Sequence, residues 1–118
     1  MVDERKIFGG SAEKLAAVYL KKKGYEIVET NWRCRLGEID LIVKSKDTLA
    51  FCEVKARKSS RFGHPLEAIT PAKQSRLRRL GEFYWSYSTD RSLTVRFDAI
   101  SISYEGEEAV IDHIEDAF

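Results

Sequence analysis

Two strand-like runs, residues 37–43 and 49–55, constrain the fold of this chain more than any other feature, because the short polar turn between them fixes which residues face each other. If the turn is centred on its Lys-Asp pair, residues whose numbers add up to 93 lie directly opposite. Asp40 on the first run then faces Glu53 on the second, with Cβ atoms about 4.5–5.5 Å apart. Two carboxylates this close repel each other unless positive charge lies between them, so the pattern predicts a divalent cation.

The simpler alternative is a solvated hairpin face on which Glu38 and Lys55, also opposite each other, form an ion pair of little energetic consequence. The residues around them argue for a more buried hairpin. One face is apolar and the acidic face is half apolar, which is typical of strands in a sheet covered on both sides. Partly buried like charges indicate a metal site or catalysis. We expect the apolar face to comprise Ile39, Leu41, Val43, Cys52 and Val54, and the acidic face to include Ile42 and Phe51.

Length and composition bound the class of protein. At 118 residues the chain is long enough for a single domain with its own core, which we expect over residues 10–103, followed by an acidic strand and tail over 104–118. The 43% hydrophobic and 33% charged residues are typical of a soluble globular protein, and no apolar run reaches the roughly 18 residues of a membrane span. Cys34 and Cys52 lack metal-site spacing and no signal peptide is evident, so the sequence predicts a cytoplasmic protein with reduced thiols and no membrane partner.

Charge is distributed unevenly, although the formal net charge is only +1. Between residues 55 and 79, eight Lys or Arg residues accompany one acid, whereas residues 97–118 contain seven acids and no Lys or Arg. A basic patch beside the carboxylate hairpin suits a polyanionic substrate that approaches one face. Scattered solvated charges are the alternative explanation of the same pattern.

The remaining sequence predicts a mixed α/β fold. Ser11 and Thr70 are typical helix caps, Pro71 is a typical first helical residue, and Gly24 is a typical residue just after a helix. The predicted order is α-β-β-β-α-β-β, a mixed central sheet with one helix on each side. In residue numbers, the elements are a helix over 11–23, strands over 25–32, 37–43 and 49–55, a helix over 70–87, and strands over 93–104 and 109–114.

In the second helix, the apolar stripe contains one cation. Lys73 lies within the stripe, so its side chain either extends past the end of the core or points at a phosphate near the acidic face of the sheet. Arg76 and Arg79 flank the stripe, where they could reach a nucleic-acid backbone. The apolar residues of the stripe are Leu77, Leu80, Tyr84 and Tyr87.

The first helix has an ordinary amphipathic pattern. Glu13, in its first turn, complements the helix dipole, and periodicity alone gives it no further role. The expected apolar face comprises Ala12, Leu15, Ala16, Val18 and Tyr19.

The chemistry that these residues favour is metal-assisted phosphodiester hydrolysis. Asp40 and Glu53 offer the carboxylate oxygens that Mg²⁺ or Mn²⁺ prefers, and Lys55 could orient or deprotonate a water or neutralise charge on phosphorus. Glycoside hydrolysis also uses two carboxylates, but it requires neither the lysine nor the basic residues. His64 and His113 have no triad spacing that would support a Ser or Cys nucleophile.

Nearly the whole chain, from about residue 10 to 103, resembles the uncharacterised bacterial YraN-like family and, more broadly, the PD-(D/E)XK nuclease superfamily. This resemblance implies a restriction-endonuclease-like fold, with Asp40 and Glu53 as metal ligands and Lys55 as the catalytic lysine. Resolvase-like members carry a further glutamate on the first helix, which implies Glu13 as a third ligand. The matching motifs are residues 37–41 (Gly-Glu-Ile-Asp-Leu), 51–57 (Phe-Cys-Glu-Val-Lys-Ala-Arg), 62–63 (Phe-Gly), Lys73 and 96–98 (Arg-Phe-Asp).

The leading hypothesis from the sequence is therefore a Mg²⁺- or Mn²⁺-dependent endonuclease that acts on DNA rather than RNA, including branched or structured DNA. Its small footprint could be enlarged by forming a homodimer. The alternatives are a nucleic-acid-binding module without turnover and a protein-interaction domain that uses exposed aromatics such as Trp85 and the acidic C-terminal end. The residues expected to hold phosphates are Arg57, Lys58, Arg61, Lys73, Arg76 and Arg79.

Overall fold

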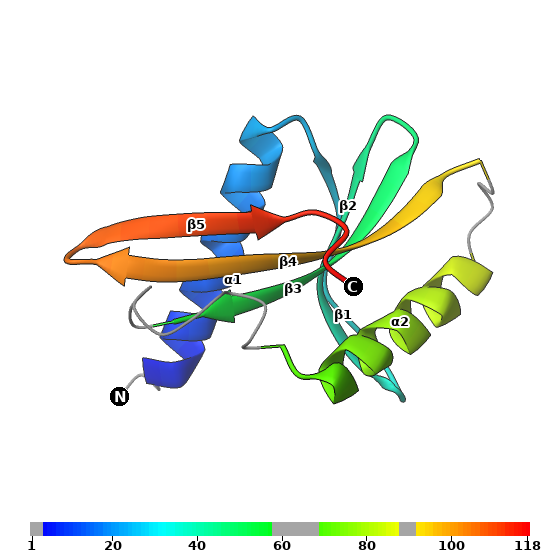
Figure 1. The fold of residues 1–118 in the computed structure, drawn as a ribbon, viewed down its shortest axis with the longest axis horizontal. Coiled ribbons are helices and arrows are strands. Elements are labelled where there is room, and N and C mark those ends of the chain that lie inside the picture. The colour runs from blue at the N-terminus through cyan, green and yellow to red at the C-terminus, as the bar shows by residue number, and fades with distance from the viewer. Residues whose placement is uncertain (1–3, 58–68, 88–91) are drawn as a thin grey trace.

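A computed structural model describes residues 4–57, 69–87 and 92–118, with side chains from residue 12 onwards. It contains a five-stranded sheet and two helices in the order α-β-β-β-α-β-β, which confirms the predicted mixed α/β fold (Figure 1). The elements are α1 (Glu4–Lys22), β1 (Glu26–Cys34), β2 (Gly37–Ser45), β3 (Thr48–Ala56), α2 (Pro71–Ser86), β4 (Thr94–Glu105) and β5 (Glu108–Ile114).

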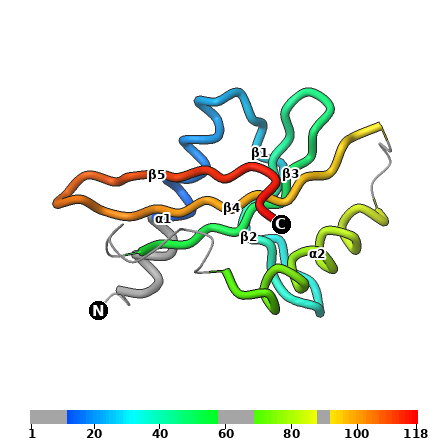
Figure 2. Tube along the Cα trace, in the orientation of Figure 1, coloured from blue at the N-terminus to red at the C-terminus, as the bar shows by residue number. Residues whose placement is uncertain are grey.

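The strands lie in the order β1-β2-β3-β4-β5, and every neighbouring pair is antiparallel except β3 and β4, which are parallel. A parallel pair needs a long crossover, and α2 lies in the connection between these two strands. The β4–β5 hairpin, which carries much of the acidic C-terminal sequence, extends beyond the other strands (Figure 2).

Two hydrophobic clusters pack on opposite faces of the sheet. The α1 cluster joins Ala12, Ala16 and Leu20 of α1 to apolar residues of β2, β3 and β4. The α2 cluster joins Leu77 and Leu80 of α2 to apolar residues of β2 and β3. The sheet is thus covered on both sides, as the apolar residues on both faces of the hairpin predicted.

The predicted register of the β2–β3 hairpin is confirmed. Ser45 pairs with Thr48 across a two-residue turn, and the pairing continues with the same sum of residue numbers to Leu41 and Cys52. At the next position Asp40 turns its carboxylate towards the neighbouring strand, and the Val54 N–H donates to Asp40 Oδ2 at 2.8 Å. The point at which the ladder ends is therefore occupied by the carboxylate that the sequence singled out.

One predicted face assignment in β2 is wrong. Ile39 was expected beside Leu41 and Val43, but it packs with Ile42 in the α2 cluster, while Leu41 and Val43 belong to the α1 cluster. Strict alternation of side chains requires a regular ladder, and the ladder with β3 ends at Leu41. The irregularity turns Asp40 towards Val54 and places Ile39 under α2.

The first helix differs from the sequence prediction in its start and in its buried face. It begins at Glu4, so position 11 lies inside the helix and is not its cap. Val18, predicted to be buried, is 50% exposed, whereas Leu20 is fully buried. The predicted end is confirmed, because Gly24 has a φ of 98°, which glycine adopts without strain.

The second helix begins as predicted, because Thr70 Oγ1 accepts a hydrogen bond from the Lys73 N–H at 3.2 Å and Pro71 is the first helical residue. Its end differs. Tyr87, predicted to be part of the apolar stripe, lies just beyond the helix and is 72% exposed, and Trp85, predicted to be exposed, packs partly buried against the α2 cluster. Helical periodicity no longer fixes the side-chain direction once the helix has ended.

Gly81 allows α2 to approach the sheet closely. A Cβ atom at this position would lie 2.7 Å from Cε1 of Phe97 and 3.1 Å from Cδ2 of Phe51.

Neither helix is long and apolar enough to cross a lipid bilayer, over the residues that the structure describes.

Candidate functional site

An open pocket lies between the ends of β2 and β3 and the first turns of α2. Acidic side chains from the two strands face basic and apolar side chains from the helix across this pocket. The lining residues are Glu38, Asp40, Glu53, Lys73, Arg76, Leu77 and Leu80.

Three carboxylates converge at one side of the pocket. Glu13 of α1, Glu38 and Asp40 each have a carboxylate oxygen, and these oxygens all lie within 4.8 Å of one another. Glu53 of β3 lines the same pocket and adds a fourth carboxylate. Because all four side chains are only partly exposed, they combine access for a ligand with strong mutual repulsion.

The electrostatics of the pocket reflect this crowding. Burial and, after it, the charges of Glu53, Glu13 and Glu38 together raise the pKa of Asp40 to about 7, although the hydrogen bond from the Val54 N–H opposes this shift. Burial also raises the pKa of Glu53, although Lys55 and Lys73 oppose that shift. A carboxylate with a pKa near neutrality is poised to release its proton when a cation binds.

Two lysines lie next to each other on the cationic side. Lys55 Nζ is 3.8 Å from Glu53 Oε1, and the Lys55 ammonium lowers the pKa of Lys73, first through its close approach and then through its charge. The first turn of α2 thus brings Lys73 to the pocket, where the helical spacing placed it, and the two ammonium groups reinforce each other's field.

The other residues predicted to hold phosphates lie in different places. Arg76 lines the pocket, whereas Arg79 is exposed on α2 outside it. Arg57 follows the end of β3, and its backbone N–H donates to the Ile102 carbonyl at 2.7 Å. Lys58 and Arg61 lie outside the described residues.

Sequence reasoning treated Glu38 only as an ion-pair partner of Lys55. In the structure, Glu38 Oε2 lies 3.2 Å from Arg33 Nε, and its carboxylate belongs to the acidic triplet. The signal was present, because Glu38 lies two residues before Asp40 in the strand and shares its face.

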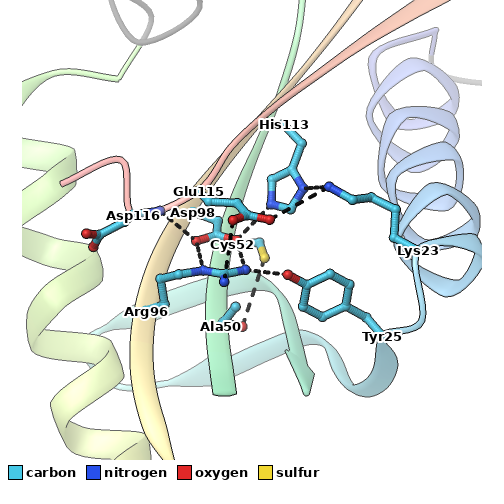
Figure 3. A network of polar contacts seen from close by, with 9 residues as sticks. All are labelled: Lys23, Tyr25, Ala50, Cys52, Arg96, Asp98, His113, Glu115 and Asp116. Atoms are coloured by element: carbon cyan, nitrogen blue, oxygen red, sulfur yellow. Dashed lines mark hydrogen bonds and ion pairs between the residues drawn. The ribbon is translucent and has the colours of Figure 1, made fainter. Parts of the chain in front are cut away.

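Sequence reasoning also missed a polar network on the other side of β3 (Figure 3). Asp98 of β4 is fully buried and accepts two hydrogen bonds from Arg96, both at 2.8 Å. The Asp116 N–H donates to the same carboxylate at 3.1 Å, and Arg96 also donates to the Tyr25 hydroxyl. Although burial acts against it, hydrogen bonds from His113 and Arg96 lower the pKa of Asp98.

His113 links this network to α1. Its Nε2 lies 2.7 Å from Asp98 Oδ2, and its Nδ1 lies 3.0 Å from Lys23 Nζ (Figure 3). Because an ammonium group only donates, Nδ1 is the acceptor and Nε2 carries the proton that is donated to Asp98. The network therefore joins the end of α1 to β4 and β5. The Arg-Phe-Asp motif was its only sequence signal.

Fold and pocket together define a small mixed α/β protein with a carboxylate and lysine site at the ends of β2 and β3, to which both helices contribute. Comparison of the sequence with known families places it more narrowly. Residues 12–102 match the model of the uncharacterised protein family UPF0102, and the chain belongs to this family. The match confirms the resemblance to YraN-like proteins.

Relatives from distant bacteria support this membership. A UPF0102 protein of Caldicellulosiruptor bescii is 46% identical over 114 residues, covering 93% of this chain and 95% of the relative. The corresponding protein of Syntrophus aciditrophicus is 43% identical over 110 residues, covering 93% and 87%. That of Nocardia farcinica is 42% identical over 118 residues, covering 99% and 93%.

Proposed function

We propose that this protein is a metal-dependent endonuclease that hydrolyses phosphodiester bonds in DNA, including branched DNA. The observation that carries the proposal is the convergence of Glu13, Glu38 and Asp40 within 4.8 Å of one another, beside a pocket that Glu53, Lys73 and Arg76 also line. Lys55 lies next to Glu53. Such a concentration of like charge, set against cations, suits a bound cation and an anionic substrate.

The donor set fits Mg²⁺ or Mn²⁺. Both are hard cations that take carboxylate oxygens and retain waters, and the converging side chains offer only such oxygens. Asp40, with Glu13 and Glu53, would hold the ion, and Glu38 is close enough to join them or to order a ligand water. When bound, the ion would act as a Lewis acid and make a bound water more acidic.

The residues of the chain itself would orient the substrate. Lys55, held beside Glu53, would position the attacking water or neutralise charge that develops on phosphorus. Lys73 and Arg76 lie on the wall opposite the carboxylates, where they would hold the phosphate being cut and its neighbour. Glu53, between Lys55 and Lys73, would keep both ammonium groups directed at that phosphate.

The proposal is tested by titrating Mg²⁺ and Mn²⁺ calorimetrically into the wild type and an Asp40→Asn/Glu53→Gln double variant. Labelled duplex, single-stranded and four-way-junction DNA are then incubated with each protein and either ion. We expect the variant to lose metal binding and to lose at least about a hundredfold in cleavage rate. The exposed Glu107→Gln variant should behave like the wild type.

Two results would contradict the proposal. Metal-independent DNA binding without cleavage would assign the protein to the binding modules. Cleavage that is equal in the wild type and the double variant would show that a contaminant or another site performs the reaction.

A further inference from the structure

One side of α2 carries a line of cationic and aromatic residues that leads away from the carboxylate pocket. Arg76 and Phe83 are seven residues apart, so they lie on the same side of the helix, and the ring of Tyr87, just beyond the helix, contacts that of Phe83. The Phe83 ring lies 5.2 Å from that of Tyr87 and 6.2 Å from that of Trp32 on β1. This side of α2 therefore faces Trp32 of β1. We call these four residues, together with the exposed Arg79, the Arg-aromatic stripe.

Core packing does not account for the outer part of this stripe. Tyr87 is 72% exposed, and Phe83 and Trp32 are only partly buried. A contact between side chains four residues apart stabilises a helix end by only about 0.2–0.5 kcal/mol. The contact explains the position of Phe83 and leaves most of the Tyr87 ring in water.

The charges that α2 itself contributes to this side are positive, although the acidic Glu29 of β1 lies near Tyr84 of the helix. Arg76 reaches into the carboxylate pocket, and Arg79 lies one turn before Phe83. The single acid of α2, Glu82, lines a separate cavity on the other side of the helix with Arg78 and Phe97. An anionic ligand along the stripe would meet no opposing charge from the helix itself.

Aromatic rings that alternate with cations are the usual platform for single-stranded nucleic acid, because bases stack on the rings while cations contact the phosphates. From Arg76 to its last residue, Ser86, the helix rises about 15 Å, which corresponds to about four base steps at 3.4 Å each. We propose that the Arg-aromatic stripe binds a DNA strand that leaves the carboxylate pocket unpaired, with one base stacked on Tyr87. The inference rests on the proposed function for the end at Arg76, but its test does not require cleavage.

The test measures equilibrium binding of an oligo(dT) of about twelve nucleotides and of a blunt duplex, by fluorescence anisotropy in EDTA so that nothing is cleaved. We expect Tyr87→Ala to weaken oligo(dT) binding between about fivefold and a hundredfold, and to change duplex binding less than about twofold. Tyr87→Phe keeps the ring and should retain wild-type affinity. Unfolding curves of the two variants show that each is folded.

A second pair of variants tests the cations. Arg79→Gln should reduce the salt dependence of oligo(dT) binding by about 0.7 in slope. Lys22→Gln, which removes an exposed cation from α1, should leave the slope unchanged.

Equal oligo(dT) affinity in the wild type and Tyr87→Ala would overturn the proposal that the stripe binds DNA, whatever the cleavage experiment shows. A loss of affinity in Tyr87→Phe as large as that in Tyr87→Ala would also overturn it, because stacking would not be the cause. Tyr87-dependent binding by a protein that cleaves nothing would support the stripe while refuting the proposed nuclease.

Discussion

Two carboxylates, on β2 and β4 of the same sheet, have pKa values that are shifted in opposite directions. The Asp98 carboxylate is fully buried and its pKa is lowered, whereas the Asp40 carboxylate remains partly exposed and its pKa is raised to about 7. Deeper burial alone would predict the reverse order. The number of hydrogen-bond donors and the charges of the neighbouring side chains decide the direction of each pKa shift.

Asp98 has a complete set of donors, from Arg96, His113 and the Asp116 backbone N–H. Within the described residues, Asp40 accepts a hydrogen bond from the Val54 N–H and has three acidic neighbours. A buried carboxylate with a full set of hydrogen-bond donors fixes the arrangement of the strands around it. A cluster of carboxylates instead lowers the stability of the fold when no cation offsets its charge. The comparison teaches that a carboxylate with few hydrogen-bond donors and several acidic neighbours is a better indication of a binding site than the burial of the carboxylate.

The largest effect is expected from removing the charge at the satisfied site. Asp98→Asn should reduce the free energy of unfolding by about 3–5 kcal/mol, because Arg96 would lose its buried counter-charge and keep only the exposed Glu115, 3.7 Å away. Chemical denaturation at neutral pH measures the change. Asp112→Asn, an exposed acid on β5, is the matched control and should change stability by less than about 0.5 kcal/mol. A comparable cost in both variants would remove the distinction between the two regions.

The same substitution at the crowded site should act in the opposite direction. Asp40→Asn should stabilise the metal-free protein by about 1–3 kcal/mol at pH 8, because it removes repulsion and keeps an acceptor for the Val54 N–H. Thermal unfolding in EDTA checks the sign, with Glu107→Gln as the control. Destabilisation by Asp40→Asn would mean that the carboxylate is already compensated without a metal.

The two carboxylates also predict opposite pH dependences. The folded pKa of Asp40 is raised, so its contribution to stability improves as the pH falls from about 7 towards its ordinary value of 3.8. The folded pKa of Asp98 is lowered, so its contribution is present above 3.8 and is lost as the pH falls below that value. Wild-type stability in EDTA should therefore rise by about 1–2 kcal/mol from pH 8 to pH 5 and decline below pH 4.

Single variants show which residue causes each of the two changes of stability with pH. Asp40→Asn should flatten the rise between pH 8 and pH 5, and Asp98→Asn should flatten the acid limb. A rise that persists unchanged in Asp40→Asn would contradict the assignment.

The smallest effect is expected at the exposed edge of the network. Lys23 contacts His113 and lies over the Tyr19 ring at 5.2 Å, but 37% of its side chain is exposed. Lys23→Met, which keeps the apolar stem, should cost about 0.5–1 kcal/mol in urea denaturation. Lys22→Met, one residue earlier and exposed, should cost less. A loss as large as that of Asp98→Asn would show that the network depends on this cation.

Much of the pocket could be predicted from the sequence because its residues are close in the chain. Asp40 and Glu53 belong to one hairpin, and a two-residue turn fixes their register. Lys73 follows from the Thr70 cap and the Pro71 start, which set the phase of α2. The position of Glu13 followed only from the family resemblance, because no local pattern relates α1 to β2.

The sequence alone could not give the network around Asp98. Its partners Arg96 and His113 are on β4 and β5, and Lys23 is 90 residues from His113. Their meeting depends on the parallel pairing of β3 with β4 and on the docking of α1 across the sheet. The face of α1 was misassigned for the same reason, since Leu20 and not Val18 meets the sheet.

Short-range chemistry therefore determined the order of the elements, the cap of α2, the hairpin register and the acidic residues at the end of its ladder. Tertiary structure decided that Glu38 joins the acidic triplet, that Tyr87 is left exposed beside Phe83, and that Asp98 finds a full set of donors. Caps, turns and periodicity act over a few residues and are written into the sequence locally. Pairing between distant strands and the docking of helices depend on the whole core, which no short segment specifies.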